Sequence, residues 1–394
     1  MSARWDVIIV GAGPAGTTAA TLLAGAGHRV LVLEREVFPR FHIGESLLPL
    51  GLTLLDELGV RPEPQVFRHK AGARFVDERS GRAAGFDFSE ALPGPPRHAW
   101  QVVRAGFDAQ MRDRAEAAGA EIRHGQTVRE VAIDADGVQV RCDSGSERGR
   151  YLVDATGQDR LLARRGRTVS PYKAFGKAAV FTHFEGLSDA AVQEIGPGGE
   201  IQVLIREDGW AWLIPLPGER LSVGVVSREA TMEQGLLDAL LQDSPLTRRL
   251  TAGAERGQTR VIGNFSFRNT APHGARYACI GDASCFLDPV FSSGVSLALV
   301  SGARLARALS ERLADGSEAA DDAMAPLSDH MERGYRTFAA LIHRFYNTRF
   351  IEHFLLDAPA DGPMVAGVTS VLTGDVWRED NPFQRMLLEA RQRR

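Results

Sequence analysis

The stretch WDVIIVGAGPAGTTAATLLAG, residues Trp5–Gly25, joins a short apolar run to a glycine-rich turn and an alanine-rich segment. A second apolar run, HRVLVLE, follows and ends at Glu34. The order strand, glycine turn, helix and strand within about 30 residues is typical of a dinucleotide-binding unit. Gly11 permits the tight turn, Gly13 lets a pyrophosphate approach the backbone, and Gly16 lets the helix pack closely on the sheet. The start of the helix offers free N–H groups to that pyrophosphate, and Glu34 is placed to accept hydrogen bonds from a ribose.

The composition narrows the class of protein. The 394 residues are 44% hydrophobic and 24% charged, as in a globular protein of two joined domains, and the net charge of −4 argues against nucleic acid as the main partner. No apolar run could span a bilayer, and the first residues lead straight into a strand, so we expect no membrane contact and a cytoplasmic location. Cys142, Cys279 and Cys285 lack metal-ligand spacing and the ten histidines are scattered, so we expect buried free thiols and no metal.

Four later segments favour FAD over NAD as the dinucleotide. They are QVVRAGFDAQMRDRAEAAGAEIR (Gln101–Arg123), YLVDATG (Tyr151–Gly157), ARYACIGDASCFLDP (Ala275–Pro289) and FSSGVSLALVSGARLARALSERL (Phe291–Leu313). Together they resemble the FAD domain of the flavin monooxygenase superfamily, which includes hydroxybenzoate hydroxylase. The resemblance implies that Asp282 bonds the ribityl chain and that Arg104 lies near the flavin phosphates. It also places Val128, in the strand after the helix, where the backbone contacts adenine.

The segment GWAWLIP, which ends at Pro215, places two of the five tryptophans two residues apart. In a strand, Trp210, Trp212 and Ile214 share one face. A well-packed core strand is one interpretation of this pattern, and a wall beside a ligand is another. The segment resembles the Trp-x-Trp-x-Ile-Pro signature of flavin-dependent halogenases, which implies that these four residues form a barrier between the flavin and the organic substrate.

Two further segments carry the same resemblance. The loop FPRFHIGESLLP (Phe38–Pro49) resembles the loop with which flavin-dependent halogenases wrap the flavin, although by itself it could lead into a helix with Ser46 as the N-cap. FLDPVFSSGVSLAL resembles their Phe-x-x-Pro-x-x-Ser-x-Gly segment. There the N–H groups of Ser293 and Gly294 are expected to hold chloride or bromide at the start of a helix. A serine cap without an ion is the alternative. Tryptophan halogenases have a glutamate where this chain has Phe291, which indicates a more activated ring, a phenol or a pyrrole.

Lys70, in FRHKAGARF, is the candidate for halogen delivery. Taken alone it reads as a surface lysine, but it matches the Lys-x-Gly-Ala-x-Phe segment of phenol and pyrrole halogenases. The resemblance implies that FADH2, O2 and halide give hypohalous acid, which then reaches the lysine through an interior passage. The lysine would either hydrogen-bond hypohalous acid as an ammonium or, as a desolvated amine, form a chloramine. The sequence leaves both open.

The predicted fold is α/β: a Rossmann-like FAD-binding domain of the hydroxybenzoate-hydroxylase type, with an inserted, mostly antiparallel β-sheet domain and a short helical C-terminal region. The expected boundaries are 1–75, 101–165 and 270–320 for the FAD domain, 76–100 and 166–269 for the sheet domain, and 321–394 for the helical region. We expect little structure after Trp377, and therefore an open substrate site. The residues expected to bind FAD are Gly11, Gly13, Pro14, Ala15, Gly16, Glu34, Arg35, Arg40, Ile43, Gly44, Glu45, Ser46, Arg104, Val128, Asp282, Pro289, Gly294 and Val295.

The expected partners follow from the same resemblance. The single Gly-x-Gly-x-x-Gly turn is used for FAD, so a separate NAD(P)H-dependent flavin reductase is implied. The substrate is expected to be an electron-rich aromatic of natural-product biosynthesis, either free or tethered to an acyl or peptidyl carrier protein. A flavin-dependent aromatic monooxygenase or dehydrogenase on the same fold is the main alternative, and a flavin-binding scaffold without catalytic activity is another.

Overall fold

The computed structural model describes residues 5–207, 209–229, 235–346, 356 and 362–392. Its first sheet has eight strands, and the main path through it runs β19-β20-β10-β1-β2-β7. The strands of this sheet are β1 (Trp5–Val10), β2 (Val30–Leu33), β7 (Glu121–Arg123), β8 (Glu130–Asp134), β9 (Gly137–Cys142), β10 (Gly145–Asp154), β19 (His273–Gly274) and β20 (Tyr277–Cys279). The central pairs β10–β1, β1–β2, β2–β7 and β10–β20 are parallel. The apolar run in β1 follows from this arrangement, since a parallel sheet is covered on both faces.

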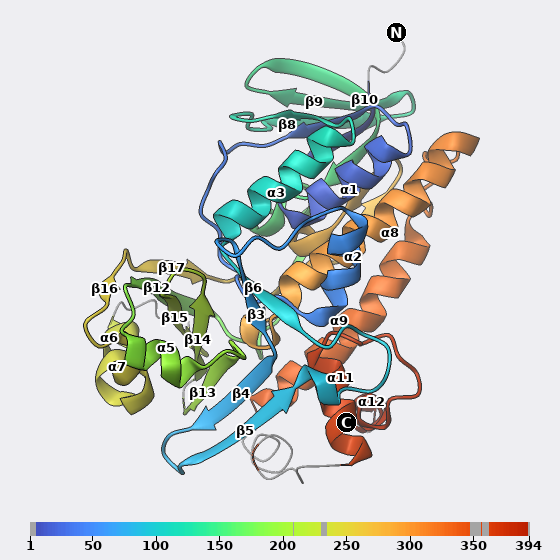
Figure 1. Ribbon diagram of the computed structural model, residues 1–394. Helices are drawn as coiled ribbons and strands as arrows, with labels where there is room; N and C mark the ends of the chain where they lie inside the picture. Colours follow the sequence, from blue (N-terminus) through green and yellow to red (C-terminus); the bar gives the residue numbers. More distant parts are fainter. Residues whose placement is uncertain (1–4, 208, 230–234, 347–355, 357–361, 393–394) are drawn as a thin grey trace.

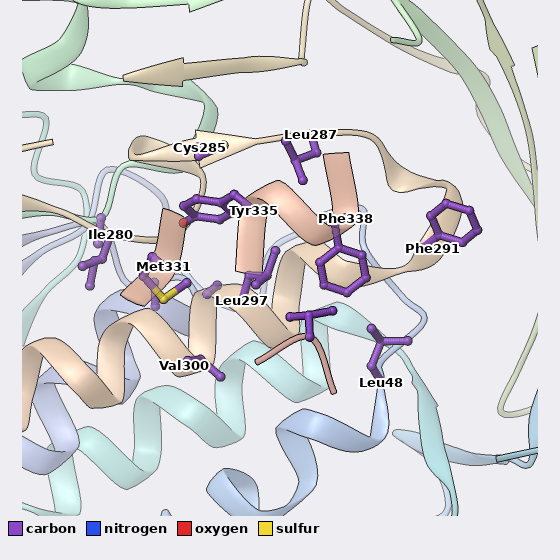
Figure 2. Close-up of a cluster of buried hydrophobic side chains, with 14 of the residues drawn as sticks. Leu48, Ile280, Cys285, Leu287, Phe291, Leu297, Val300, Met331, Tyr335 and Phe338 are labelled. Atoms are coloured by element: carbon purple, nitrogen blue, oxygen red, sulfur yellow. The ribbon is translucent and has the colours of Figure 1, made fainter. Parts of the chain in front are cut away.

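Three long helices cover one face of this sheet. They are α1 (Pro14–Gly25), α3 (Arg104–Ala117) and α8 (Ser293–Asp315). Figure 1 shows the three lying side by side, with α9 (Ala325–Phe345) next to α8. Figure 2 shows part of the core between the last two helices, where Tyr335 and Phe338 of α9 lie close to Leu297 and Val300 of α8.

The predicted glycine turn is present between β1 and α1. Gly11 has φ = 104°, and a Cβ atom there would lie 2.4 Å from the carbonyl oxygen of Ala155. A Cβ atom at Gly16 would lie 2.0 Å from the carbonyl oxygen of Gly11. The turn is therefore packed so closely against the neighbouring strand end and helix that only glycine fits at these two positions.

The second sheet also has eight strands, in the order β16-β12-β15-β14-β13-β4-β5 with β17 beside β12. They are β4 (Gly72–Asp77), β5 (Arg82–Asp87), β12 (Ala178–Glu185), β13 (Ile201–Arg206), β14 (Gly209–Leu216), β15 (Arg220–Ser227), β16 (Glu255–Arg256) and β17 (Arg260–Gly263). All pairs are antiparallel except β13–β4, and the predicted hairpin is β14–β15. The expected domain boundary at 75/76 falls inside β4, so this sheet begins earlier in the chain than 76.

Helices shield the outer face of the second sheet. They are α5 (Asp189–Ile195), α6 (Gly235–Asp243) and α7 (Pro245–Thr251), grouped together in Figure 1. Leu237 and Leu240 of α6 pack with Ala211 and Leu213 of β14. Because residues alternate along a strand, the tryptophans of β14 face the opposite way, toward the first sheet.

The remaining elements connect and cap the two sheets. They are β3 (Phe67–Lys70), β6 (Ala99–Val102), β11 (Val169–Pro171), β18 (Phe267–Asn269), β21 (Cys285–Phe286), α2 (Leu52–Glu57), α4 (Leu161–Gly166), α11 (Pro363–Leu372) and α12 (Pro382–Gln392). The expectation of little structure after Trp377 was wrong, because α12 follows it and buries Phe383 and Leu387 against the core. Parts of the predicted helical region, 347–355, 357–361 and 393–394, lie outside the described residues.

Across the described ranges, no helix combines the length and the apolar character that crossing a bilayer requires. Within the same ranges, no three His, Cys, Asp or Glu side chains cluster as metal ligands would. Cys142, Cys279 and Cys285 are buried free thiols, as predicted.

Candidate active site

A cavity of about 770 Å³ lies between the two sheets. All of the predicted FAD-binding residues except Gly16 line it. Gly16 lies beneath the turn, where its role is close packing. The walls change character along the cavity: charged side chains and the start of α1 form one part, while Phe181, Trp210 and Trp212 belong to the other. This division fits a dinucleotide with an aromatic ring system at one end.

The glycine turn forms the charged part of the cavity together with Glu34. Glu34 is 6% exposed, and its Oε2 accepts a hydrogen bond from the N–H of Ala12 at 2.7 Å while Oε1 accepts one from the N–H of Glu36 at 2.9 Å. These bonds fix the carboxylate at the end of β2, and each oxygen keeps a lone pair for a ribose hydroxyl. The helix α1 begins with no side-chain cap, so its first N–H groups are available to a pyrophosphate.

Arg40 and Arg104 share the buried carboxylate of Asp108. Arg104 donates from Nε and Nη2 to its two oxygens at 2.9 and 3.0 Å, and Arg40 Nη1 lies 3.0 Å from Oδ2. Burial alone would raise the pKa of Asp108, but Arg104 and then Arg40 hold it below its usual value. Arg104 also donates to the carbonyl oxygens of Ile43 and Gly44. One carboxylate thus serves two guanidinium groups, which leaves positive charge at the cavity wall and ties down the loop that carries the His-Ile-Gly-Glu-Ser sequence.

In this region the secondary structure around Val128 differs from the prediction, and His42 was not predicted as part of the site. Val128 does line the cavity, but it lies in irregular chain between β7 and β8 and not in a strand, because β7 already ends at Arg123. His42, which the sequence did not single out, lies 3.3 Å from Arg104 Nη1 through its Nδ1. Desolvation by the surrounding loop and the neighbouring Arg104 lower the pKa of His42 to about 4.

The tryptophans form a continuous wall of the cavity. Trp210 and Trp212 are 1% and 4% exposed, and their ring centroids lie 5.8 Å apart. Trp212 donates from Nε1 to Ser222 Oγ at 3.1 Å and pairs with Gly224 on β15, where a Cβ atom would lie 2.3 Å from the Trp212 ring. Gly224 therefore makes room for the indole, and the hydrogen bond fixes its orientation.

Pro215 does not belong to this wall. Ile214 lines the cavity with the tryptophans, whereas Pro215 lies on the opposite face of β14, beside Leu213 and Leu221 in a smaller hollow. The two-residue period of a strand explains the difference, since 210, 212 and 214 share a face that 215 cannot share.

The start of α8 provides the candidate halide site. Ser292, in the left-handed conformation at φ = 55°, precedes the helix and makes no side-chain cap. The first N–H groups of a helix have no intrahelical acceptor, so those of Ser293 and Gly294 can bind an anion, and Gly294 lines the cavity. Phe291 points away into the core, with its ring centroid 5.6 Å from that of Phe345.

Lys70 is buried, so its interpretation as a surface lysine was wrong. Its side chain is 1% exposed, and Nζ donates hydrogen bonds of 2.8 Å to Ser46 Oγ and to the carbonyl oxygen of Leu47. The same Nζ lies 5.3 Å from the centroid of the Phe88 ring. Burial lowers the pKa of Lys70 to about 7. Ser46 lines the cavity while accepting from Lys70, and it is therefore not an N-cap: the turn that leads into α2 has Leu48 as its cap residue.

The contacts of two buried carboxylates, Glu45 and Asp288, were not predicted from the sequence. Glu45 was expected to bind FAD, but its pairing with a histidine was not expected, and Asp288 was not named as a site residue. Glu45 Oε1 lies 2.7 Å from His183 Nε2 on β12. Asp288, which is 2% exposed, accepts hydrogen bonds from Gly176 N–H at 2.9 Å and from the Tyr346 hydroxyl at 2.7 Å. Burial raises the pKa of Asp288 to about 6. The alternation along β12 could have placed His183 on the cavity face, but its partner lies 138 residues away in the chain.

The chain is similar to known proteins over nearly its whole length. The family model described as Tryptophan halogenase matches residues 6–95 and 92–354. A flavin-dependent halogenase, armH3 of Armillaria mellea, is 30% identical over 86% of this chain and 74% of its own length. The 1H-pyrrole-2-carbonyl-[peptidyl-carrier protein] brominase of Pseudoalteromonas luteoviolacea (strain 2ta16) is 31% identical over 80% of this chain and 79% of its own length. The structure of the flavin-dependent brominase Bmp2 superposes with a TM-score of 0.86 at 28% identity, over 99% of this chain and 98% of that one.

Proposed function

This chain belongs to the flavin-dependent halogenase family, and from that premise we propose that it halogenates an electron-rich ring, a phenol or a pyrrole, presented on a carrier protein. The observation that carries the proposal is the arrangement of cavity, tryptophan wall and Lys70: the cavity suits FAD, and Lys70 is buried next to it, in contact with Ser46 of its wall. Phe291, in place of a carboxylate at the start of α8, favours a ring that is already activated.

The residues present fit FAD as the cofactor. The α1 N-terminus with Arg40 would hold the pyrophosphate, Glu34 the ribose, and Asp282 the ribityl hydroxyls. Asp282 accepts a hydrogen bond from Gln158 at 3.2 Å, and burial raises its pKa to about 6. When bound, reduced flavin would supply two of the four electrons that O2 takes up, and halide would give the other two as it is oxidised to hypohalous acid.

In this proposal the protein keeps the organic ring apart from the flavin and directs the electrophilic halogen toward the ring. The N–H groups of Ser293 and Gly294 hold the halide at the helix start, and the indoles of Trp210 and Trp212 exclude the organic ring from the cavity. Lys70, which contacts Ser46 of the cavity wall, receives hypohalous acid and orients its halogen toward the ring. The ring carbon attacks the halogen, the O–X bond breaks, and the ring proton leaves with the hydroxide as water.

A separate flavin reductase supplies the reduced cofactor in this proposal, since the one glycine-rich turn is taken by FAD. The tryptophan wall argues against the alternative of an aromatic monooxygenase, because in this proposal the two indoles keep the organic ring out of the cavity. Carrier presentation draws support from the brominase relative, whose name gives a pyrrole bound to a peptidyl carrier protein.

The experiment offers one ring in two forms. Purified protein, FAD, a flavin reductase, NADH and bromide are supplied with pyrrole-2-carboxylate, either free or as the thioester of a peptidyl carrier protein, and a matching pair is made with a hydroxybenzoate. We expect a bromine isotope doublet on the carrier-bound form and at least a tenfold lower rate on the free acid. Equal rates on both forms would contradict carrier presentation, and a hydroxylated product that forms without bromide would contradict halogenation.

A further inference from the structure

Glu45 presents an unusual carboxylate to the cavity. Its side chain is 4% exposed, and it lies next to Ser46 in the loop that lines the cavity. Oε1 is bonded to His183, whereas Oε2 is buried without a hydrogen-bond partner among the described residues. A buried carboxylate oxygen without a partner carries a desolvation cost, so it indicates a position that is completed by a ligand or a proton.

His183 connects this carboxylate with the surface. On β12, Ala179 and Phe181 line the cavity, and His183 is the next residue on the same face of the strand. Its side chain is 20% exposed, and the Phe41 ring stands edge-on to the imidazole at 5.7 Å. The pair Glu45–His183 therefore runs from the cavity wall to solvent through one hydrogen bond of 2.7 Å.

Halide oxidation consumes a proton in the cavity. With the cofactor counted as FADH2, the balance is FADH2 + O2 + X⁻ + H⁺ → FAD + HOX + H2O. Halide loses two electrons and the flavin two, O2 gains four, the O–O bond breaks, an O–X bond forms, and the second oxygen leaves as water. The proton on the left must reach that second oxygen at a place largely surrounded by apolar and aromatic side chains.

The other carboxylates of the cavity wall differ from Glu45 in their hydrogen bonds. Both oxygens of Glu34 accept backbone N–H groups, and Asp282 accepts from Gln158. Among the cavity-lining carboxylates that the structure describes, Glu45 alone has a buried oxygen with no partner.

We propose that Glu45 and His183 form a proton relay, in which Glu45 donates to the departing oxygen during halide oxidation and His183 returns a proton to Glu45 from solvent. Glu45 faces the reacting atoms, and His183 acts through it as a positioning and relay residue. This inference rests on the proposed halogenation, since that reaction sets the proton balance.

The test compares wild type with Glu45→Gln and His183→Ala, and uses His28→Ala as a matched control. His28 bonds to Ser310 and lies outside the cavity wall. FAD dissociation constants of His183→Ala and His28→Ala, measured by flavin fluorescence, are expected to stay within about threefold of wild type, and a hydrogen-bonded imidazole N–H resonance of the apo protein should shift in Glu45→Gln. Bromination should fall at least tenfold in Glu45→Gln and His183→Ala and stay unchanged in His28→Ala. Added imidazole should restore His183→Ala and leave Glu45→Gln inactive, and the rate of His183→Ala should show a larger solvent deuterium isotope effect than that of wild type.

The outcomes separate the two proposals. A wild type that makes no brominated product overturns the proposed function. A wild type that brominates, with His183→Ala equally active or not rescued by imidazole while still binding FAD, overturns the relay alone. If His183→Ala does not fold, His183→Gln replaces it, and undiminished bromination by that variant also overturns the relay.

Discussion

Lys70 and Ser46 are joined by a hydrogen bond of 2.8 Å between Nζ and Oγ, and this bond connects a fully buried amine with the wall of the cavity. The two residues lie 24 positions apart, one at the end of β3 and the other in the loop before α2. Because the loop is also held by Arg104, the position of Lys70 depends on the same structure that would enclose FAD.

The burial of Lys70 predicts a pH-dependent cost in stability. Its pKa is lowered from 10.5 to about 7, so between these values the unfolded chain binds more protons than the folded one and wild-type stability rises with pH. Lys70→Met removes the buried amine, and we expect it to raise the free energy of unfolding by several kcal/mol at pH 7 and by much less at pH 10. Urea unfolding at the two pH values measures this difference. An equal effect at both values would show that the folded-state pKa is not depressed.

Ser46→Ala should uncouple Lys70 from the cavity. The Nζ group of Lys70 loses one of its two oxygen acceptors. FAD affinity is measured alongside, because Ser46 is also among the residues expected to bind FAD. We expect bromination of the ring to fall at least fivefold and hypobromous acid to appear in solution, where an added scavenger such as a β-diketone captures it. Unchanged partitioning between ring and scavenger would assign Ser46 no part in guiding the electrophile.

The tryptophan wall predicts a change in the kind of product. Trp212→Ala opens the face of β14 toward the cavity and is expected to cost about 3–5 kcal/mol in stability. If the indole separates the ring from the flavin, the variant should form some hydroxylated ring, detected by mass spectrometry. Trp377→Ala is the control, because that indole stacks on His330 in the C-terminal region. A Trp212 variant that folds, binds FAD and never hydroxylates would return β14 to a packing role.

The glycines of α1 offer a matched pair. Gly16→Ala places a methyl group where the carbonyl oxygen of Gly11 already lies, at 2.0 Å, and should lower FAD affinity at least tenfold and destabilise the fold. Gly25→Ala, at the other end of the helix, meets no atom within 4 Å and should be neutral or slightly stabilising. Fluorescence titration with FAD and thermal unfolding distinguish the two. Equal FAD affinity in both variants would contradict the requirement for close packing at the turn.

Patterns within short stretches of sequence correctly predicted those strands, turns and helices that form from residues close together in the chain. The strand, turn and helix of Trp5–Gly25 and the β14–β15 hairpin follow from spacing and glycine placement, and the structure has both. The prediction that Pro215 belongs to the tryptophan wall was wrong, because the whole Trp-x-Trp-x-Ile-Pro signature was assigned to one face of the strand. The two-residue period of a strand places Pro215 on the other face.

The features that the sequence could not predict are those that depend on contacts between residues far apart in the chain. The burial of Lys70 depends on the loop around Ser46 folding over β3, and the pairing of Glu45 with His183 joins the first sheet's loop to the second sheet. The exposure of a side chain depends on such packing, which neither composition nor spacing encodes. The same limit applies to Asp108, whose charge is shared by two arginines from different segments.

The most direct test of the central claim compares wild type and Lys70→Met in one assay with FAD, a flavin reductase, NADH, O2 and bromide, on carrier-bound pyrrole and phenol rings. Mass spectrometry of the product is read together with O2 consumption and FAD affinity. The account predicts a bromine isotope doublet from wild type and none from Lys70→Met, with equal FAD affinity and O2 consumption in both. Retained bromination by Lys70→Met, or a bromide-independent hydroxylated product from wild type, would contradict it.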